Sequence, residues 1–399
     1  MFLTKEEEKI YEGEYGEAKA SMMRLLVAIG EVYGASKLIK PTNAHVSGVS
    51  YKTIGDVGLE FIEGLAKKNA KASIQSQLNP AGIDLKNWSK LNIPKDFAKK
   101  QIRIISAYEK IGIKALCTCT PYLIGISPRI SEHIAWAESS AVVFANSVLG
   151  ARTNREAATT ALASAIVGRT PFYGLHLEEQ RHPTHLIDVK VDLLNELDFS
   201  LLGYSIGKDL RTGIPFIRGI KGEIKNDYLK ALSASIAVSS SIAMFHIDGI
   251  TPESNMEEKD NLKNLEKISI TNYELKKVNE ELSFTNEFDT VCIGCPHCSI
   301  NEIKYIAEMS MGKKFQKRFF IYTSRKVLEL AKKIGYVSLI ESAGGKIISD
   351  TCMVVSPLES LGIKSVLTNS CKAAYYLSSL CKLKVKLANL SECIRYAVQ

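Results

Sequence analysis

The sequence contains no long uninterrupted apolar run, and this argues against a membrane span. Its longest apolar stretch, residues 231–247, carries five serines. It falls short of the roughly 20 apolar residues that cross a bilayer. Such a stretch is typical of a buried helix that packs closely through small residues, so we expect no membrane contact.

The N-terminus also lacks the features of a secretory leader. Charged residues begin at Lys5 and continue through Glu8, where a leader would have an apolar segment. We therefore expect a cytoplasmic protein. Because disulfides are rare in the cytoplasm, the nine cysteines are expected to be free thiols or metal ligands.

No concentrated basic patch is visible in the sequence. The formal net charge is +8, but the lysines are scattered, apart from Lys67, Lys68 and Lys71. A nucleic-acid-binding protein gathers such charges on one face, so we expect no nucleic-acid partner. With 46% hydrophobic and 24% charged residues, the chain has the composition of a large globular protein. Its modest positive charge suits an enzyme that acts on small anions.

Strands and helices alternate regularly in the C-terminal part, residues 287–399. This alternation with short loops predicts parallel strand pairing in a three-layer α/β domain. In such a domain, ligands bind at the carboxyl ends of the strands. The expected strands are residues 288–294, 318–323, 346–355 and 363–368, and the expected helices are residues 299–310, 324–335, 338–343 and 370–380.

The N-terminal part, residues 1–286, is expected to be an α/β region that carries substrate-binding loops. A glycine-rich, polar stretch at residues 41–58 predicts a loop whose backbone approaches a ligand. Residues 251–287 are rich in Glu, Lys and Asn and predict a charged helix or linker between the two parts. Helices are expected at residues 18–33, 101–111 and 131–149, with a first helix opening at Thr4 and a turn at residues 117–122.

Cys292, Cys295 and Cys298 form a C-x2-C-x2-C run that resembles a metal-binding motif. A zinc ribbon would need a second C-x2-C pair, and a ferredoxin-type run would need a Cys-Pro ligand shortly afterwards. The sequence contains neither. Cys292 lies inside an expected strand, and its simpler interpretation is a small buried hydrophobic residue. A non-catalytic protein that binds zinc or a partner through this run remains an alternative.

Three cysteines stand in turns rather than in regular elements. Cys295 follows Gly294 and precedes a helix start, whose N-terminal field favours a thiolate. Cys119 lies in the turn before Pro121, and Cys352 lies at the end of an expected strand. A three-cysteine site assembled from distant segments is one possible outcome. Cys381 and Cys393 lie in leucine-rich settings and are expected to belong to the core.

Eight segments of the chain resemble the aconitase X family, the divergent branch of the aconitase superfamily. They occur in one order from residue 44 to residue 370, and their combination is far more specific than any single one. They include Thr118-Cys-Thr-Pro-Tyr122, Gly294-Cys-Pro-His297 and Asp350-Thr-Cys352. The others are residues 44–56, 136–141, 145–155, 168–171 and 368–370.

The resemblance implies an aconitase-like fold, with several three-layer α/β/α domains around a cleft that contains an iron–sulfur cluster. Carried over by motif, the metal ligands are Cys119, Cys295 and Cys352, and the expected cofactor is a [4Fe–4S] cluster. Three cysteines would leave one iron without a protein thiolate, free to act on the substrate hydroxyl as a Lewis acid. Three cysteines depart from or compete with the family pattern: Cys298 stands where an apolar residue is expected, Cys371 where glycine is expected, and Cys117 lies two residues before Cys119.

The resemblance also implies a hydro-lyase, an enzyme that removes water from its substrate. Such an enzyme needs groups that bind an anionic hydroxy acid. The residues that we expect to bind substrate are polar or cationic and fall in or beside the family segments. Arg155 is a further candidate for anion binding, with a surface ion pair as its simpler interpretation. The expected set is His45, Ser47, Gly48, Ser50, Tyr51, Glu138, Asn146, Arg152, Asn154, Arg169 and Lys372.

The family resemblance further implies a partner. Aconitase-type enzymes use a swivelling domain that contributes a catalytic serine base, and single-chain family members are much longer than this sequence. We therefore expect a separate small swivel-domain subunit, with no certain catalytic base in this chain.

Two-subunit members include archaeal enzymes of the modified mevalonate pathway of isoprenoid biosynthesis. They dehydrate (R)-5-phosphomevalonate to trans-anhydromevalonate 5-phosphate, while other family members dehydrate cis-3-hydroxy-L-proline. The Lys, Ile and Glu usage and the two-subunit size of this sequence resemble those of the archaeal enzymes. They therefore favour phosphomevalonate as the substrate, and cis-3-hydroxy-L-proline remains the alternative.

Overall fold

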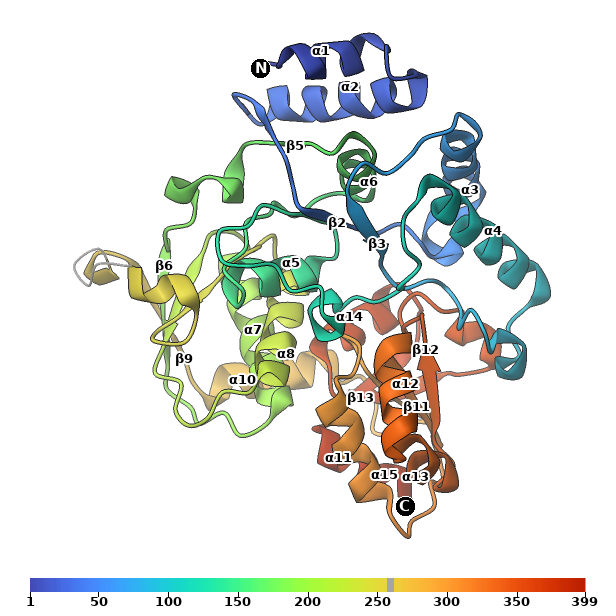
Figure 1. Ribbon diagram of the computed structural model, residues 1–399. Coiled ribbons are helices and arrows are strands. Elements are labelled where there is room, and N and C mark those ends of the chain that lie inside the picture. The colour runs from blue at the N-terminus through green and yellow to red at the C-terminus, as the bar shows by residue number, and fades with distance from the viewer. Residues whose placement is uncertain (257–261, 399) are drawn as a thin grey trace.

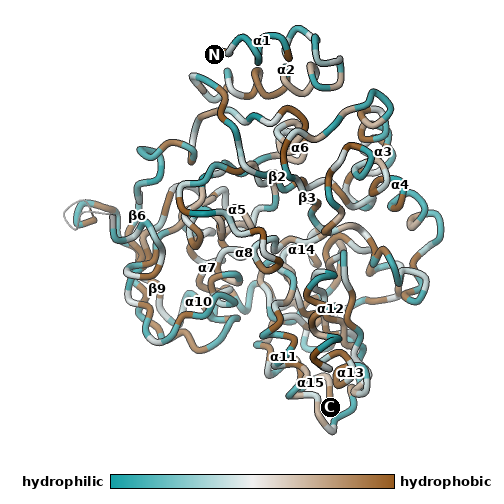
Figure 2. Tube along the Cα trace, in the orientation of Figure 1, coloured by the Kyte–Doolittle hydropathy of each residue, from teal (hydrophilic) through white to brown (hydrophobic). Residues whose placement is uncertain are grey.

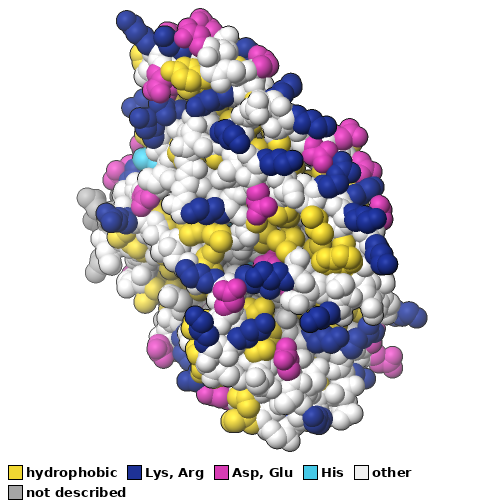
Figure 3. Space-filling model, turned by 45° about the vertical axis from the view of Figure 1, so that its right-hand side comes forward, with side chains coloured by type: hydrophobic (Ala, Val, Ile, Leu, Met, Phe, Trp, Pro, Cys, Tyr) yellow, Lys and Arg dark blue, Asp and Glu magenta, His cyan; other side chains and the backbone are white. Residues whose placement is uncertain are grey.

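The computed structural model describes residues 1–256 and 262–398 and contains three parallel sheets with helices around them (Figure 1). The expected α/β class is confirmed. Within the described residues, no helix is long and apolar enough to cross a membrane. On the face drawn in Figure 3, lysine and arginine side chains are dispersed among acidic and polar ones.

The first sheet lies in the N-terminal third, in the strand order β3-β2-β4, and all of its strands are parallel. A separate antiparallel pair, β1 (Leu38–Ile39) with β5 (Thr170–Pro171), lies beside it. The buried faces of the surrounding helices form one apolar core with this sheet. The strands are β2 (Asn43–Val46), β3 (Gln75–Leu78) and β4 (Ala135–Trp136), and the helices are α1 (Lys5–Glu12), α2 (Glu17–Val32), α3 (Tyr51–Lys67), α4 (Lys95–Ile111) and α6 (Ala158–Val167). Helix α5 (Ser139–Ser147) follows β4 but packs into other apolar clusters.

The second sheet has four parallel strands in the order β8-β7-β6-β9. Helices α7 and α8 pack closely against each other beside it. The apolar stretch noted in the sequence forms most of α8, which is buried as expected. The strands are β6 (His185–Val189), β7 (Pro215–Arg218), β8 (His246–Ile247) and β9 (Glu266–Ile270), and the helices are α7 (Glu196–Leu210), α8 (Asn226–Ser239) and α10 (Asn272–Leu282).

The third sheet has five parallel strands in the order β12-β11-β10-β13-β14 and is covered on both faces. Val291 and Ile293 of β10 face one apolar cluster with helices α11, α12, α13 and α15, while Cys292 faces another with α14. The predicted three-layer arrangement is therefore present. The strands are β10 (Thr290–Ile293), β11 (Arg318–Thr323), β12 (Lys346–Ser349), β13 (Ser365–Thr368) and β14 (Lys384–Leu387), and the helices are α11 (Ile300–Ser310), α12 (Arg325–Ile334), α13 (Tyr336–Ser342), α14 (Cys371–Ser379) and α15 (Leu390–Val398).

The second and third sheets share a continuous apolar core. Helix α14 packs on α7 and α8, and one buried cluster extends from Val143 to Leu387. Figure 2 shows hydrophobic segments concentrated in the interior of these parts, with hydrophilic ones along the outer loops. The expected division near residue 286 falls between α10 and β10 and stays a prediction.

Two expectations for the N-terminal part were wrong, and a third was right in part. The loop expected at residues 41–58 contains β2 and the start of α3, because parallel pairing with β3 and β4 satisfies the backbone of a short polar strand. The helix expected at residues 131–149 begins only at Ser139, since β4 precedes it and Glu138 caps it. The charged helix or linker expected at residues 251–287 is right in part: it contains the helix α10, but also the strand β9, which was not expected, and residues 257–261 lie outside the described residues.

The third sheet also differs in detail from the prediction. Strand β12 ends at Ser349 rather than at residue 355, because Asp350 adopts a left-handed backbone conformation with φ of 64°. This turn redirects the chain toward Cys352. Helix α13 begins directly after Gly335, two residues earlier than expected. Strand β14 and helix α15 complete the domain and were not predicted.

A pair of histidines offers a test of the folded structure through the pH dependence of its stability. His133 and His176 face each other with 3.0 Å between their Nδ1 atoms. Burial, followed by the charges of His133, Arg181 and Arg152, lowers the pKa of His176 to about 3. The unfolded chain would therefore bind a proton below about pH 6.5 that the folded chain does not.

We accordingly predict that the free energy of unfolding falls as the pH is lowered from 7 toward 5. This one group contributes up to about 1.4 kcal/mol per pH unit. Urea unfolding at several pH values measures the slope. The Gln side chain of the His176→Gln variant cannot titrate. The slope of the free energy of unfolding against pH should therefore decrease by the amount that corresponds to about one proton. An unchanged slope would contradict the assignment.

Candidate active site

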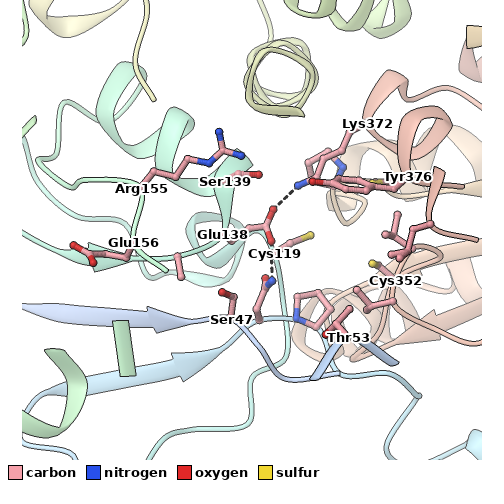
Figure 4. Close-up of a pocket in the computed structure, with 18 of the residues that line it drawn as sticks. Ser47, Thr53, Cys119, Glu138, Ser139, Arg155, Glu156, Cys352, Lys372 and Tyr376 are labelled. Atoms are coloured by element: carbon pink, nitrogen blue, oxygen red, sulfur yellow. Dashed lines mark hydrogen bonds and ion pairs between the residues drawn. The ribbon is translucent and has the colours of Figure 1, made fainter. Parts of the chain in front are cut away.

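A cavity of about 500 Å³ lies where the first-sheet loops meet the third sheet. Its lining residues come from three regions far apart in the sequence: residues 47–80, 119–157 and 295–380. Figure 4 shows the side chains of these segments facing a common space. The cavity is lined by Ser47, Thr53, Asn79, Pro80, Cys119, Ala137, Glu138, Ser139, Arg155, Glu156, Ala157, Cys295, Pro296, Cys352, Val354, Val355, Lys372, Tyr376 and Leu380.

Three cysteines line this cavity, and they come from three different segments of the chain. Cys295 comes two residues after β10, and Cys352 comes three residues after β12. The carboxyl ends of parallel strands share one sheet edge, which places both residues there. Cys119 precedes the short 3₁₀ helix at Pro121–Ile124 and approaches from the first part of the chain.

Gly294 makes the approach of Cys295 possible. Its φ is 106°, and a Cβ atom at this position would lie 2.2 Å from the backbone oxygen of Tyr322. No larger residue fits between β10 and β11 without moving the backbone. The glycine thus sets the direction in which the chain leaves β10.

The other six cysteines do not line this cavity, and all nine lie in the described part of the chain. Cys292 and Cys298 pack into the apolar clusters on opposite faces of the third sheet. Cys117 belongs to the core of the first part, and Cys371 to that of the second and third. The C-x2-C-x2-C run therefore does not act as one unit, since only its middle member reaches the cavity.

The three cavity cysteines suit a cluster better than a single metal ion. Among the described residues, no three His, Cys, Asp or Glu side chains are placed to hold one metal ion. In an iron–sulfur cluster the cysteines bind different irons, which allows wider spacing. Burial raises the pKa of Cys352 to about 11, of Cys295 to about 12 and of Cys119 well above its usual value. Thiolates at these positions would therefore require nearby positive charge, which metal ions supply.

A buried ion pair lines the same cavity beside the cysteines. Lys372 Nζ, at the start of α14, contacts Glu138 Oε1, and Asn79 Nδ2 donates to Glu138 Oε2 at 2.7 Å (Figure 4). Burial would raise the pKa of Glu138, but the charge of Lys372 and the hydrogen bonds from Lys372 and Asn79 lower it to about 2. Burial disfavours the charged form of Lys372, yet Glu138 raises its pKa above the usual value. Both groups are therefore ionised at neutral pH.

Arg155 supplies the other cation of the cavity and has a different environment. Its Nη1 donates to the backbone oxygen of Ser240 at 2.9 Å, and its side chain is exposed. No carboxylate pairs with it among the described residues. In Figure 4 it extends toward Ser139, while the carboxylate of Glu156 points away from the cysteines.

Of the residues expected to bind substrate, Ser47, Glu138 and Lys372 line the cavity. Gly48 and Ser50 follow Ser47 in the same loop but do not line it. Ser50 instead caps α3 and donates its hydroxyl to the backbone oxygen of Val355 at 2.8 Å. This bond joins the substrate loop to the segment after Cys352.

The remaining expected residues lie outside the cavity lining, and their roles stay predictions. His45 bonds through Nε2 to the backbone oxygen of Thr118 at 2.8 Å, behind Cys119. The others make the following contacts: Tyr51 with Asp56 and Lys100, Asn146 with the backbone of Thr153 and Ala243, Arg152 with Glu178, Asn154 with the backbone of Tyr173, and Arg169 with Glu7. Asn146 and Glu138 do not share a helix face, because Glu138 precedes α5.

Sequence reasoning missed Asn79, Ser139 and Tyr376. Asn79 follows the short strand β3, which was itself not predicted. Ser139 is the first residue of α5 and was placed within a longer helix. Tyr376 lies one turn after Lys372 on α14 and could have been found from that spacing.

The ion pair gives a stability prediction. Lys372→Met would leave the Glu138 carboxylate buried without a counter-charge, so we expect a loss of about 3–5 kcal/mol in the free energy of unfolding. Adding Glu138→Gln to the same chain should recover part of this loss, because the buried charge is then removed. Urea unfolding of the two single variants and the double variant measures the coupling.

The exposed pair between Arg24 and Glu17 is the matched control. Arg24→Met should cost about 1 kcal/mol or less. Equal losses for Lys372→Met and Arg24→Met would mean that the Glu138 contact contributes little.

Comparison with known proteins places the chain in one family. Models of the first, second and third domains of aconitase X match residues 1–179, 183–280 and 288–399. The chain is 51% identical over 402 residues to the phosphomevalonate dehydratase large subunit of Methanocaldococcus jannaschii, covering 99% of this chain and 100% of that one. It is 33% identical to a cis-3-hydroxy-L-proline dehydratase of Pseudomonas aeruginosa, covering 97% of this chain and 68% of that one.

A solved structure agrees with this assignment. The crystal structure of Thermococcus kodakaraensis aconitase X in its holo form superposes with a TM-score of 0.93 at 44% identity, and the match covers 100% of both chains. Family models that match nearly the whole chain, full-length relatives and the shared fold all agree: the chain belongs to the aconitase X family.

Proposed function

We propose that this chain is the large subunit of a hydro-lyase that dehydrates (R)-5-phosphomevalonate to trans-anhydromevalonate 5-phosphate. The observation that carries the proposal is the cavity, which three cysteines line together with a buried lysine and an arginine that has no carboxylate partner among the described residues. Full-length similarity to phosphomevalonate dehydratase large subunits from several archaea supports this substrate. The hydroxyproline dehydratases are more distant and longer than this chain.

Cys119, Cys295 and Cys352 are the proposed ligands of an iron–sulfur cluster of the [4Fe–4S] type. The donor set fits, because these three cysteines line the cavity and no fourth cysteine of the described chain does. When bound, the cluster would supply a Lewis acid for the departing hydroxyl.

Lys372 is proposed to bind the substrate carboxylate. Its ammonium group faces the same space as the cysteines and is kept protonated by Glu138. Glu138 and Ser140 orient it, since Ser140 Oγ lies 3.3 Å from Lys372 Nζ and 3.0 Å from Glu138 Oε1. A charge held in this way needs little reorganisation when substrate arrives.

The proton acceptor is proposed to come from a small partner subunit. Among the carboxylates of the cavity lining, Glu138 has a pKa of about 2 and is a weak base, while Glu156 faces away from the cysteines. His45 is buried behind Cys119 and bonded to Thr118. The names of the archaeal relatives include "large subunit", which supports a complex in which a swivel-domain subunit supplies a serine base.

Arg155 is the proposed ligand of the substrate phosphate. Helix α6 begins beside it, and the N-cap residue Ala157 provides no side-chain cap, so the first backbone N–H groups of α6 add to the positive field. Lys372 is neutralised by Glu138, whereas Arg155 has no acidic partner among the described residues. The two cations therefore suit a substrate that carries a carboxylate at one end and a phosphate at the other.

The main prediction concerns the cysteines and is tested on the complex of both subunits, reconstituted with iron and sulfide under anaerobic conditions. The native complex should turn over phosphomevalonate. Cys295→Ser should lose the visible absorbance of the cluster and at least about a hundredfold in kcat, because one ligand and the Lewis acid are lost. Cys298→Ala, in the same C-x2-C-x2-C run, is the matched control and should keep both.

Other outcomes would overturn specific parts of this proposal. Turnover of cis-3-hydroxy-L-proline but not of phosphomevalonate would replace the substrate. A colourless native protein with one zinc per chain would replace the cluster and favour a non-catalytic metal site.

A second prediction concerns Arg155. Arg155→Gln should raise KM for phosphomevalonate about tenfold or more, with a smaller change in kcat, because it removes binding that is equal in the ground and transition states. Arg152→Gln is the control, since Arg152 pairs with Glu178 outside the cavity. An unchanged KM in Arg155→Gln would place the phosphate elsewhere.

A further inference from the structure

The three cavity cysteines belong to separate segments, and one buried histidine joins all of them. His297 lies two residues after Cys295. Its Nδ1 lies 3.1 Å from the hydroxyl of Thr118, which precedes Cys119. Its Nε2 lies 2.9 Å from the backbone oxygen of Thr351, which precedes Cys352.

The partners of this ring determine its protonation. A carbonyl oxygen can only accept, so Nε2 carries the proton and donates to Thr351. Nδ1 is then the acceptor for the hydroxyl of Thr118, whose oxygen also accepts from the backbone N–H of Thr120 at 3.2 Å. Both ring nitrogens are satisfied, and burial, which lowers the pKa of His297 to about 4, keeps the ring neutral at neutral pH.

The backbone of His297 continues the same connection. Its N–H donates to Cys119 Sγ at 3.3 Å. Its carbonyl oxygen accepts from Lys230 Nζ at 3.3 Å, and Lys230 is itself held by Glu302 and by Asp227 at 3.2 Å. His297 thus receives support from α8 and α11 on the side away from the cavity.

The ring of His297 and its two partners are shielded from water. Thr118 and His297 are 0% exposed, and Thr351 is 1% exposed. A buried carbonyl or hydroxyl that loses its partner costs the full desolvation penalty of that group. The three segments are therefore held in register by bonds that water cannot replace.

We propose that His297 is a positioning residue that holds the three cysteine segments in a cluster-binding arrangement before any cluster is bound. The identity of the bound group rests on the proposed function, but the connection itself belongs to the protein chain. Neither His297 nor Thr118 lines the cavity, so the effect acts through the cysteines.

The experiment separates the two ring bonds. His297→Leu removes both, His297→Gln keeps an N–H that can reach Thr351, and Thr118→Val removes only the bond on the Cys119 side. His176→Leu, a buried histidine outside this region, controls for general loss of stability. The first readout uses the full chain without metal: the rate at which iodoacetamide labels each cysteine, followed by mass spectrometry.

We expect His297→Leu to speed labelling of Cys119 and Cys352 about tenfold, and Thr118→Val to speed labelling of Cys119 alone. His297→Gln should restore the slower rate at Cys352. His176→Leu should change neither. Native labelling rates in both His297→Leu and Thr118→Val would overturn the proposal.

The second readout uses the reconstituted complex. Loss of the cluster to a chelator should be about 10–100-fold faster in His297→Leu than in the native complex, as for other residues that support metal ligands, and the electron paramagnetic resonance spectrum of the reduced protein should change. If the native complex takes up no iron, the proposed cluster is wrong, while the labelling rates still decide the role of His297. If the native cluster forms and His297→Leu loses it no faster than His176→Leu does, His297 does not position the ligands.

Discussion

The contact between Lys372 and Glu138 is the interaction on which the site depends. It joins the start of α14, at the edge of the third sheet, to the residue that caps α5 in the first part of the chain. Both charges are buried, and each is tolerable only because the other is present. Without this contact each of the two walls of the cavity would carry a buried charge with no counter-charge.

Other buried polar contacts reinforce the same junction. Arg325 bonds to Asp84 at 2.8 Å and also contacts Asp350, which fixes the segment before Cys352. The backbone N–H of Ala81 donates to the oxygen of Asp350 at 2.8 Å. Together with the bond from Ser50 to Val355, these contacts bind the first part of the chain to both sides of Cys352. The cysteine loops are therefore parts of a rigid boundary between domains, as a site that must hold geometry requires.

Charge is distributed unevenly along the cavity, so its two ends differ in how they can bind an anionic substrate. The inner cation is paired, so it can orient a carboxylate without making the cysteine side strongly positive. The outer cation, Arg155, has no acidic partner in the described part of the chain and lies beside the N-terminus of α6, which has no side-chain cap. This difference could not be read from the sequence, where Arg152, Arg155 and Arg169 occur in similar glycine- and asparagine-rich settings. Folding pairs Arg152 and Arg169 with glutamates and leaves Arg155 at the cavity.

The sequence by itself determined the α/β character of the C-terminal domain, because strands and helices there differ clearly in hydrophobic period and have strong start signals, such as the capping box of Ser299 and Glu302. It also determined the family, through short motifs in a fixed order. Only the tertiary structure decided which residues meet. Strands β2 and β3 are short and partly polar, β4 is only two residues long, and all three exist because neighbouring strands satisfy their backbone groups. Cys119 reaches Cys295 and Cys352 only because two domains pack together, and a cavity built from such distant segments leaves no periodic signal in the chain.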